Sequence, residues 1–118
     1  MRHRVKKVKI KKGVDYKTAL IRNLAMSVII YDKIKTTAAK ANAVQPFVER
    51  LITIAKREKD KREAIREIEK LLQHKNSSKK IFEVLLDKYK DRNSGFTRIT
   101  KLGYRSGDNA PVVQIELV

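Results

Sequence analysis

The spacing of apolar residues predicts four helices before the pattern changes near the C-terminus. In the segment from Asp15 to Tyr31 apolar residues recur at intervals of three and four, and no charge lies between Asn23 and Tyr31. We therefore expect a helix that is covered on every side at the centre of the fold, capped by Asp15. A buried strand over residues 28–31 is the alternative. The stripe comprises Tyr16, Leu20, Leu24, Val28 and Tyr31.

A short strand and a second helix are expected next. Alternation and β-branched residues predict a strand over residues 32–37. Thr37 can then cap a helix whose apolar stripe runs to about Lys56. Pro46 lies inside that stripe, where its ring removes one backbone hydrogen bond, so a kink or a restart is expected near Gln45.

Two further helical stripes follow. Asp60 and Glu63 have the capping-box spacing at the start of the third helix. His74 is expected to be a solvated helix end, and Ser77 or Ser78 is expected to cap the fourth helix. The two stripes are Ala64, Ile65, Ile68, Leu71 and Leu72, and then Ile81, Phe82, Leu85, Leu86 and Tyr89.

After a turn-type cluster at residues 93–95, the period changes to that of strands. Residues 96–102 and 112–117 are the two strands expected, with residues 103–111 between them, and the alternation in the second predicts one wet face. The fold class is therefore α/β in the α+β sense, with about four helices packed on a small three-stranded sheet. We expect residues 1–13 to be a basic extended arm and residues 14–118 a single globular domain.

The net charge of the chain says more about its function than any motif does. Twenty-nine Lys and Arg face thirteen Asp and Glu, which gives a net charge of +16 and a pI near 10.3. Such an excess does not stabilise a fold, because like charges repel in the compact state, so a polyanionic partner is expected. Residues 1–48 contain twelve basic side chains and two acidic ones, so we expect the partner to bind mainly along the N-terminal half of the chain. No segment is long and apolar enough to span a bilayer.

Three groups of residues are candidates for binding phosphates. The arm orders along a polyanion by displacing counterions, or else remains a solvated tail. A strand-to-helix junction offers free N–H groups, or else is an ordinary cap. The C-terminal loop presents an arginine and a tyrosine, or else is a stiff surface turn. The residues are Arg2, His3, Arg4, Lys6, Lys7, Lys9, Lys11 and Lys12; Arg22, Asn23, Lys35, Thr36, Thr37 and Lys40; and Arg98, Lys101, Tyr104 and Arg105.

The sequence contains no arrangement of residues that is typical of a catalytic site. The chain has no cysteine, which suits a reducing compartment, and its two histidines are far apart in sequence. Glu63, Glu67 and Glu69 are expected to be a solvated face paired with neighbouring Lys and Arg. We therefore expect no catalytic residue, no metal site, no cofactor and no small-molecule substrate.

Several stretches together resemble the bacterial-type large-subunit ribosomal protein seventeen family. They occur in order over essentially the whole chain, with residues 57–78 resembling it least. They are Met1-Arg2-His3-Arg4, Arg22-Asn23-Leu24-Ala25, Ile34-Lys35-Thr36-Thr37, Leu51-Ile52-Thr53-Ile54-Ala55-Lys56, Gly95-Phe96-Thr97-Arg98-Ile99, Arg105-Ser106-Gly107-Asp108-Asn109-Ala110-Pro111 and Ile115-Glu116-Leu117.

The resemblance implies a small mixed sheet against helices and a structural, non-enzymatic role in the large ribosomal subunit of bacteria. It also implies binding to large-subunit (23S-type) ribosomal RNA, support of assembly and translation, neighbouring ribosomal proteins near the tunnel exit, and a cytoplasmic location in the ribosome. The rivals are an architectural DNA-binding protein, a small nuclease and a membrane-surface basic protein. Charge alone does not separate DNA from RNA, whereas a nuclease would need a catalytic constellation that the sequence lacks.

Overall fold

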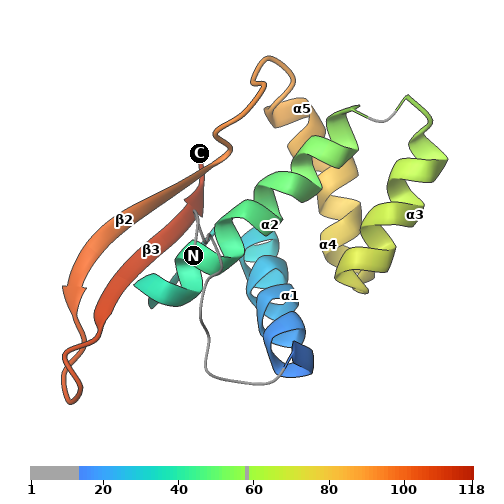
Figure 1. The fold of residues 1–118 in the computed structure, drawn as a ribbon. Helices are drawn as coiled ribbons and strands as arrows, with labels where there is room; N and C mark the ends of the chain where they lie inside the picture. Colours follow the sequence, from blue (N-terminus) through green and yellow to red (C-terminus); the bar gives the residue numbers. More distant parts are fainter. Residues whose placement is uncertain (1–13, 58) are drawn as a thin grey trace, which may run out of the picture.

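The computed structural model describes residues 14–57 and 59–118, so the expected arm lies outside the described residues. Helices pack against one face of a three-stranded sheet (Figure 1). The segments α4, η1 and α5 follow one another without a break, with a π-helical stretch in the middle. The described residues therefore form the four expected helices. The elements are α1 Val14–Tyr31, β1 Lys33–Thr37, α2 Ala38–Arg57, α3 Lys61–Leu72, α4 Lys75–Lys80, η1 Ile81–Leu85, α5 Leu86–Lys88, β2 Thr97–Tyr104 and β3 Pro111–Leu117.

The sheet is antiparallel throughout, so the expected mixed sheet is wrong. The strand order is β1-β3-β2, and β3 pairs antiparallel with both neighbours. The hairpin connection places β2 beside β3, and the helices between β1 and β2 leave β1 on the other edge of β3. Because β3 lies between them, β1 and β2, which run parallel to each other, are not neighbours. Val113, Ile115 and Leu117 are buried, while Gln114 and Glu116 are half-buried, which confirms the expected alternation.

The central helix is α2 rather than α1. One face of α2 is buried, and the helix contacts all three strands, α1, α3 and the last helix. Among the α1 side chains that the structure describes, only Ala25, Val28 and Ile29 are buried, whereas Tyr16 and Tyr31 are 49% and 70% exposed. Because α1 lies at the side of the helical layer, only part of its apolar surface is covered (Figure 1). Residues 28–31 are helical, so the strand alternative for them is wrong.

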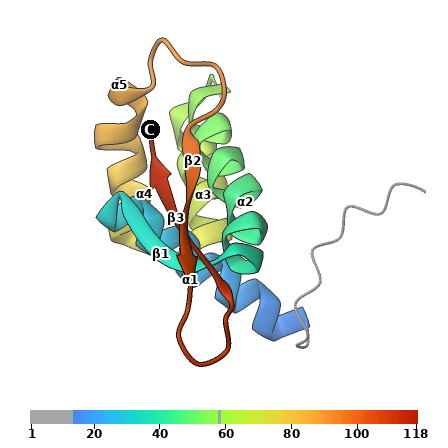
Figure 2. The ribbon, with the colours of Figure 1, turned by 90° about the vertical axis from the view of Figure 1, so that its left-hand side faces the viewer.

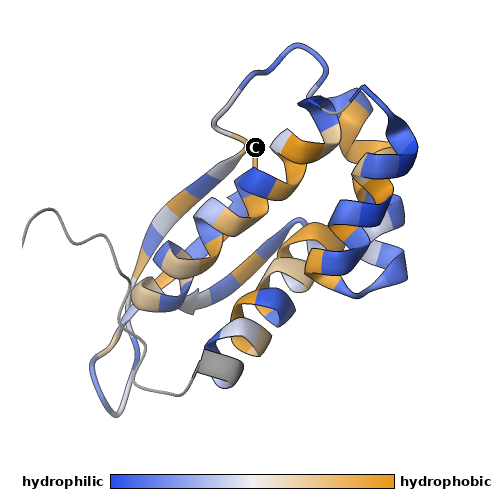
Figure 3. Cartoon of the chain, turned by 45° about the vertical axis from the view of Figure 1, so that its right-hand side comes forward, coloured by the Kyte–Doolittle hydropathy of each residue, from blue (hydrophilic) through white to orange (hydrophobic). Residues whose placement is uncertain are grey.

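The N-cap expected at Asp15 is wrong, and so is the helix restart expected near Gln45. Asp15 lies within α1, which already includes Val14, so it is not the N-cap. At Pro46 α2 continues without a restart. Pro46 and Asn42 both lie on the exposed side of the helix, so the carbonyl of Asn42, which has no N–H partner at Pro46, faces water. Hydrophobic and hydrophilic bands alternate along the helices, as this one-sided burial requires (Figure 3).

The caps of the third and fourth helices are built differently from each other. Asp60 caps α3 as expected, because its carboxylate accepts from the N–H of Arg62 at 3.0 Å. His74 is the N-cap of α4, and its Nδ1 accepts from the N–H of Ser77 at 3.2 Å. Ser77 and Ser78 are buried inside the helix, and their hydroxyls donate to the carbonyl of His74. The expectation of a serine cap is therefore wrong.

Replacement of Pro46 by alanine should raise the free energy of unfolding. A proline inside a helix costs about 3 kcal/mol relative to alanine, and the exposed ring of Pro46 contributes little packing. We expect Pro46→Ala to gain about 1–3 kcal/mol in urea unfolding followed by circular dichroism. The matched control is Pro111→Ala at the first residue of β3, which should change stability by under about 0.5 kcal/mol. No gain from Pro46→Ala would contradict this account.

Candidate nucleic-acid interface

The outer face of the sheet carries basic side chains in register. Glu116 of β3 lies opposite Lys33 of β1 and Arg98 of β2. One pleat further on, Gln114 lies opposite Lys35 and Thr100. Residues directly opposite each other in a sheet point to the same face. Lys33, Lys35, Arg98 and Thr100 are exposed, and among the described residues no helix covers this face (Figure 2).

The charge of this face is only partly neutralised. Arg98 lies 3.7 Å from a carboxylate oxygen of Glu116, and both groups retain contact with solvent. Lys33 and Lys35 have no ion-pair partner in the part of the chain that the structure describes. Such cations can replace the counterions of a nucleic-acid backbone without first breaking an ion pair inside the protein.

The β2–β3 hairpin extends beyond the helices (Figures 1 and 2). A register shift between Lys101 and Gly103 interrupts its ladder, and Tyr104 at the end of β2 is 71% exposed. Lys101, Tyr104 and Ala38, the first residue of α2, are among the residues that line a shallow cavity of about 360 Å³. The structure thus brings the predicted C-terminal group next to the predicted strand-to-helix junction, where Thr36 and Thr37 are half-buried.

The hairpin loop holds Arg105 in an internal ion pair. The Nε of Arg105 donates to Oδ1 of Asp108 at 3.1 Å, and a terminal guanidinium nitrogen of Arg105 donates to Oδ2 of Asp108. The Asp108 carboxylate also accepts from the N–H of Ala110 at 3.2 Å. The hydrogen bond from Arg105 is the larger cause and the one from the N–H of Ala110 the smaller, and together they lower the pKa of Asp108 to about 2. The loop is therefore held in one conformation by its own side chains, and Arg105 is both paired with Asp108 and exposed.

The remaining predicted residues do not form one group. Arg22 lies against α3, where its Nε donates to the carbonyl of Leu71 at 3.1 Å and a terminal nitrogen donates to Gln73 at 3.2 Å. Asn23 is exposed on α1, and Lys40 is half-buried in the first turn of α2. The arm residues from Arg2 to Lys12 lie outside the described residues. The structure therefore places Lys35 and Arg98 on the same face of the sheet, whereas Arg22 lies elsewhere, against α3.

Other cations stabilise the fold rather than face a partner. Lys80 donates to the carbonyl of Ile30 at 3.0 Å and to Asp32 at 2.8 Å, which closes the C-terminal end of α1. Lys56 donates to the carbonyl of Arg92. The acids of α3 are exposed as expected, but they make no ion pair with their neighbours in the described structure.

Sequence reasoning did not single out Lys33 or Thr100 as candidates. The alternation in Lys33-Ile34-Lys35 could have found Lys33, because residues two apart in a strand share a face. Thr100 required the register between β2 and β3, which no local pattern gives.

The described residues show no cluster of His, Asp and Glu side chains that could hold a metal ion. In the same part of the chain, none of the helices has the length and apolar character needed to cross a bilayer.

Comparison with known proteins gives a consistent result. A family model described as Ribosomal protein L17 matches residues 20–118. The chain is 45% identical over 118 residues to the large ribosomal subunit protein bL17 of Solibacter usitatus (strain Ellin6076), covering all of this chain and 77% of the relative. It is 45% identical to the protein of that name from Chloroflexus aggregans (strain MD-66 / DSM 9485), over the full length of both. The bL17 of Ehrlichia ruminantium (strain Gardel) is 42% identical, with 94% of it covered.

A small α+β fold with a basic open sheet face, together with these relatives, defines a ribosomal protein and not an enzyme. The chain belongs to the ribosomal protein L17 family, as its resemblance to that family had indicated.

The ion pair of the hairpin loop should persist throughout the physiological pH range. The pKa of Asp108 is lowered in the folded loop from 3.8 to about 2, so the pair is fully present above the ordinary value and is lost only as pH falls through about 2. The carboxyl ¹³C shift of Asp108, followed by NMR, should titrate near that low value. In Arg105→Ala the midpoint should rise toward 3.8, because the largest cause of the shift is removed. A midpoint that is the same in both proteins would show that Arg105 does not hold Asp108.

Proposed function

We propose that the protein binds large-subunit ribosomal RNA through its basic arm and the basic surface of its sheet and hairpin, and so supports subunit assembly and translation. Family membership makes it a constituent of the large ribosomal subunit, located in the ribosome. The observation that carries the RNA-binding role is the outer sheet face. Lys33, Lys35 and Arg98 are exposed on it, and its one acid, Glu116, lies opposite Lys33 and Arg98.

Each part of this surface has a distinct role in the proposal. The cations of the sheet face neutralise phosphates along one RNA strand, because consecutive pairs on a sheet are spaced regularly. At the hairpin, Lys101 contacts phosphate, and exposed Tyr104 packs against a ribose or a base. The ion pair between Arg105 and Asp108 keeps the loop in one conformation, so little ordering entropy is lost on binding.

Residues 1–13 supply the densest cluster of positive charge in the chain, and the proposal assigns them to phosphates between RNA helices. Residues 14–118 act in this proposal as a single folded domain that docks against the RNA surface. Most of these contacts position the protein, so specificity comes from RNA shape rather than from sequence. Neighbouring ribosomal proteins near the tunnel exit complete the proposed set of partners.

Removing cations from the sheet face should lower the salt dependence of RNA binding. The slope of log K against log salt falls by about one unit for every cation that no longer meets a phosphate. We expect Lys35→Ala and Arg98→Ala each to reduce the slope by about one, and deletion of residues 1–12 to reduce it by several units. Filter binding of the full chain to large-subunit ribosomal RNA over a range of salt concentrations measures this.

The matched control is Arg66→Ala, which removes the same charge from the exposed side of α3, outside the proposed surface. A slope change at Arg66 equal to that at Arg98 would mean that only net charge matters. Comparable affinity for generic duplex DNA would favour an architectural DNA-binding protein instead.

A further inference from the structure

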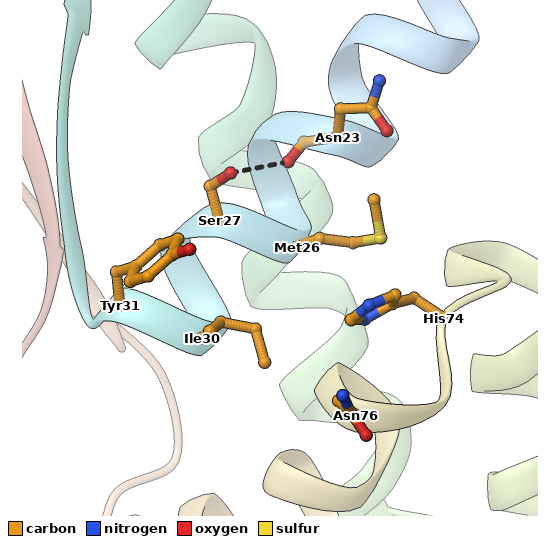
Figure 4. Close-up of a pocket in the computed structure, with 7 residues that line it drawn as sticks. All are labelled: Asn23, Met26, Ser27, Ile30, Tyr31, His74 and Asn76. Carbon is orange, nitrogen blue, oxygen red and sulfur yellow. Dashed lines mark hydrogen bonds between the residues drawn. The ribbon is translucent and has the colours of Figure 1, made fainter.

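A cavity of about 480 Å³ lies between the outer side of α1 and the start of α4, away from the outer sheet face. Its lining comprises Asn23, Met26, Ser27, Ile30, Tyr31, His74 and Asn76 (Figure 4). That volume falls within the range of about 300–1,000 Å³ that is typical of small-molecule sites. The residues come from two elements that lie far apart in sequence, so the fold creates the cavity.

This pocket combines apolar surface from Met26, Ile30 and the Tyr31 ring with the polar groups of Asn23, Ser27, His74 and Asn76. Met26, Ile30 and Tyr31 are on the part of α1 that no other described element covers completely. The side-chain amides of Asn23 and Asn76 are exposed and have no hydrogen-bond partner among the described residues. Figure 4 shows the imidazole of His74 extending from α4 toward Met26 and Ile30.

The cap of α4 engages one imidazole nitrogen of His74, Nδ1. Its Nδ1 accepts from the backbone N–H of Ser77 at 3.2 Å and also lies 2.9 Å from the hydroxyl of Ser77. A neutral imidazole whose Nδ1 accepts must carry its proton on Nε2. The Nε2–H group is then a hydrogen-bond donor without a partner among the described residues. The residue that caps α4 is thus also part of the lining of the pocket.

We propose that this pocket binds an unpaired nucleobase of ribosomal RNA, an inference that rests on the function proposed above. A nucleobase has flat apolar faces for Met26 and Tyr31 and carries donors and acceptors along its edge. An amide both donates and accepts, so Asn23 and Asn76 can pair with a base edge, while Nε2–H of His74 meets an acceptor.

The polar groups distinguish this occupant from an apolar protein segment. An aliphatic side chain in the pocket would bury both amides and the imidazole N–H without partners, and each such group opposes binding. The lining contains no carboxylate that would repel a phosphate.

Photocrosslinking in intact large ribosomal subunits tests the inference. Tyr31, which is 70% exposed, is replaced by p-azidophenylalanine, a near-isosteric change that leaves the core untouched. We expect an adduct on the ribosomal RNA at an unpaired nucleotide. The double variant Asn23→Leu with Asn76→Leu should lower the adduct yield about tenfold, because its side chains no longer pair with a base edge. The control Asn42→Leu, at an exposed asparagine of α2, should leave the yield unchanged.

The same photocrosslinker placed at Tyr104 distinguishes a failure of the pocket proposal from a failure of the proposed RNA binding by the hairpin. An RNA adduct from Tyr104 together with a protein adduct, or no adduct, from Tyr31 would overturn the pocket while leaving RNA binding by the hairpin in place. A Tyr31 adduct whose yield the leucine variants do not change would also overturn it. No RNA adduct from either position would overturn both proposals. His74→Ser, which retains a capping hydroxyl but lacks the imidazole, should lower the Tyr31 yield without loss of helix content.

Discussion

The burial of one face of α2 is the interaction on which the rest of this structure depends. Val44, Val48, Leu51 and Ile52 are fully buried, and the helix contacts each strand of the sheet as well as α1, α3 and the last helix. Burial of large aliphatic side chains contributes about 1.5–3 kcal/mol each, so this face accounts for a large share of the stability. Because α2 packs on only one side of the sheet, the other side remains open, and it is the open side that carries Lys33, Lys35 and Arg98.

The cations of the described chain divide into two kinds with different physical roles. Arg22, Lys56 and Lys80 donate to backbone carbonyls or side chains of other elements, and so they connect parts of the fold that lie far apart in sequence. Lys33 and Lys35 make no such contact among the described residues and retain their full charge toward solvent. A high net charge therefore overstates the charge that is available to a partner, and only the structure separates the two kinds.

Local patterns were sufficient to predict the elements of the fold. The helical stripe containing Val44, Val48 and Leu51 and the alternation at Val113 and Ile115 both match buried positions. They could not identify the central helix, because periodicity measures how apolar a face is and not which elements cover it. Tyr16 and Tyr31 were expected to face the core for this reason, yet both are exposed.

The candidate site was predictable to a lesser extent. Lys35, Arg98 and Lys101 were found from charge and strand pattern, and all three are exposed. Lys35 and Arg98 lie on the open sheet face, whereas Lys101 pairs with Val113 and lies on the other face, beside the start of α2. The contacts of Arg22 with α3 join residues 49 and 51 positions apart, so no local pattern could have found them. The cap by His74 was missed because serine is the commoner capping residue, and the pocket it borders arises only when α1 meets α4.

Sedimentation of the tagged protein from a cell lysate, repeated after a high-salt wash, tests the central claim most directly. If the arm, sheet face and hairpin together hold the protein on ribosomal RNA, it should remain in the large-subunit peak, stoichiometric with the particle, after the wash. Release to the top of the gradient at modest salt would contradict the account, because it would mean a loosely held polyanion binder rather than a built-in part of the subunit.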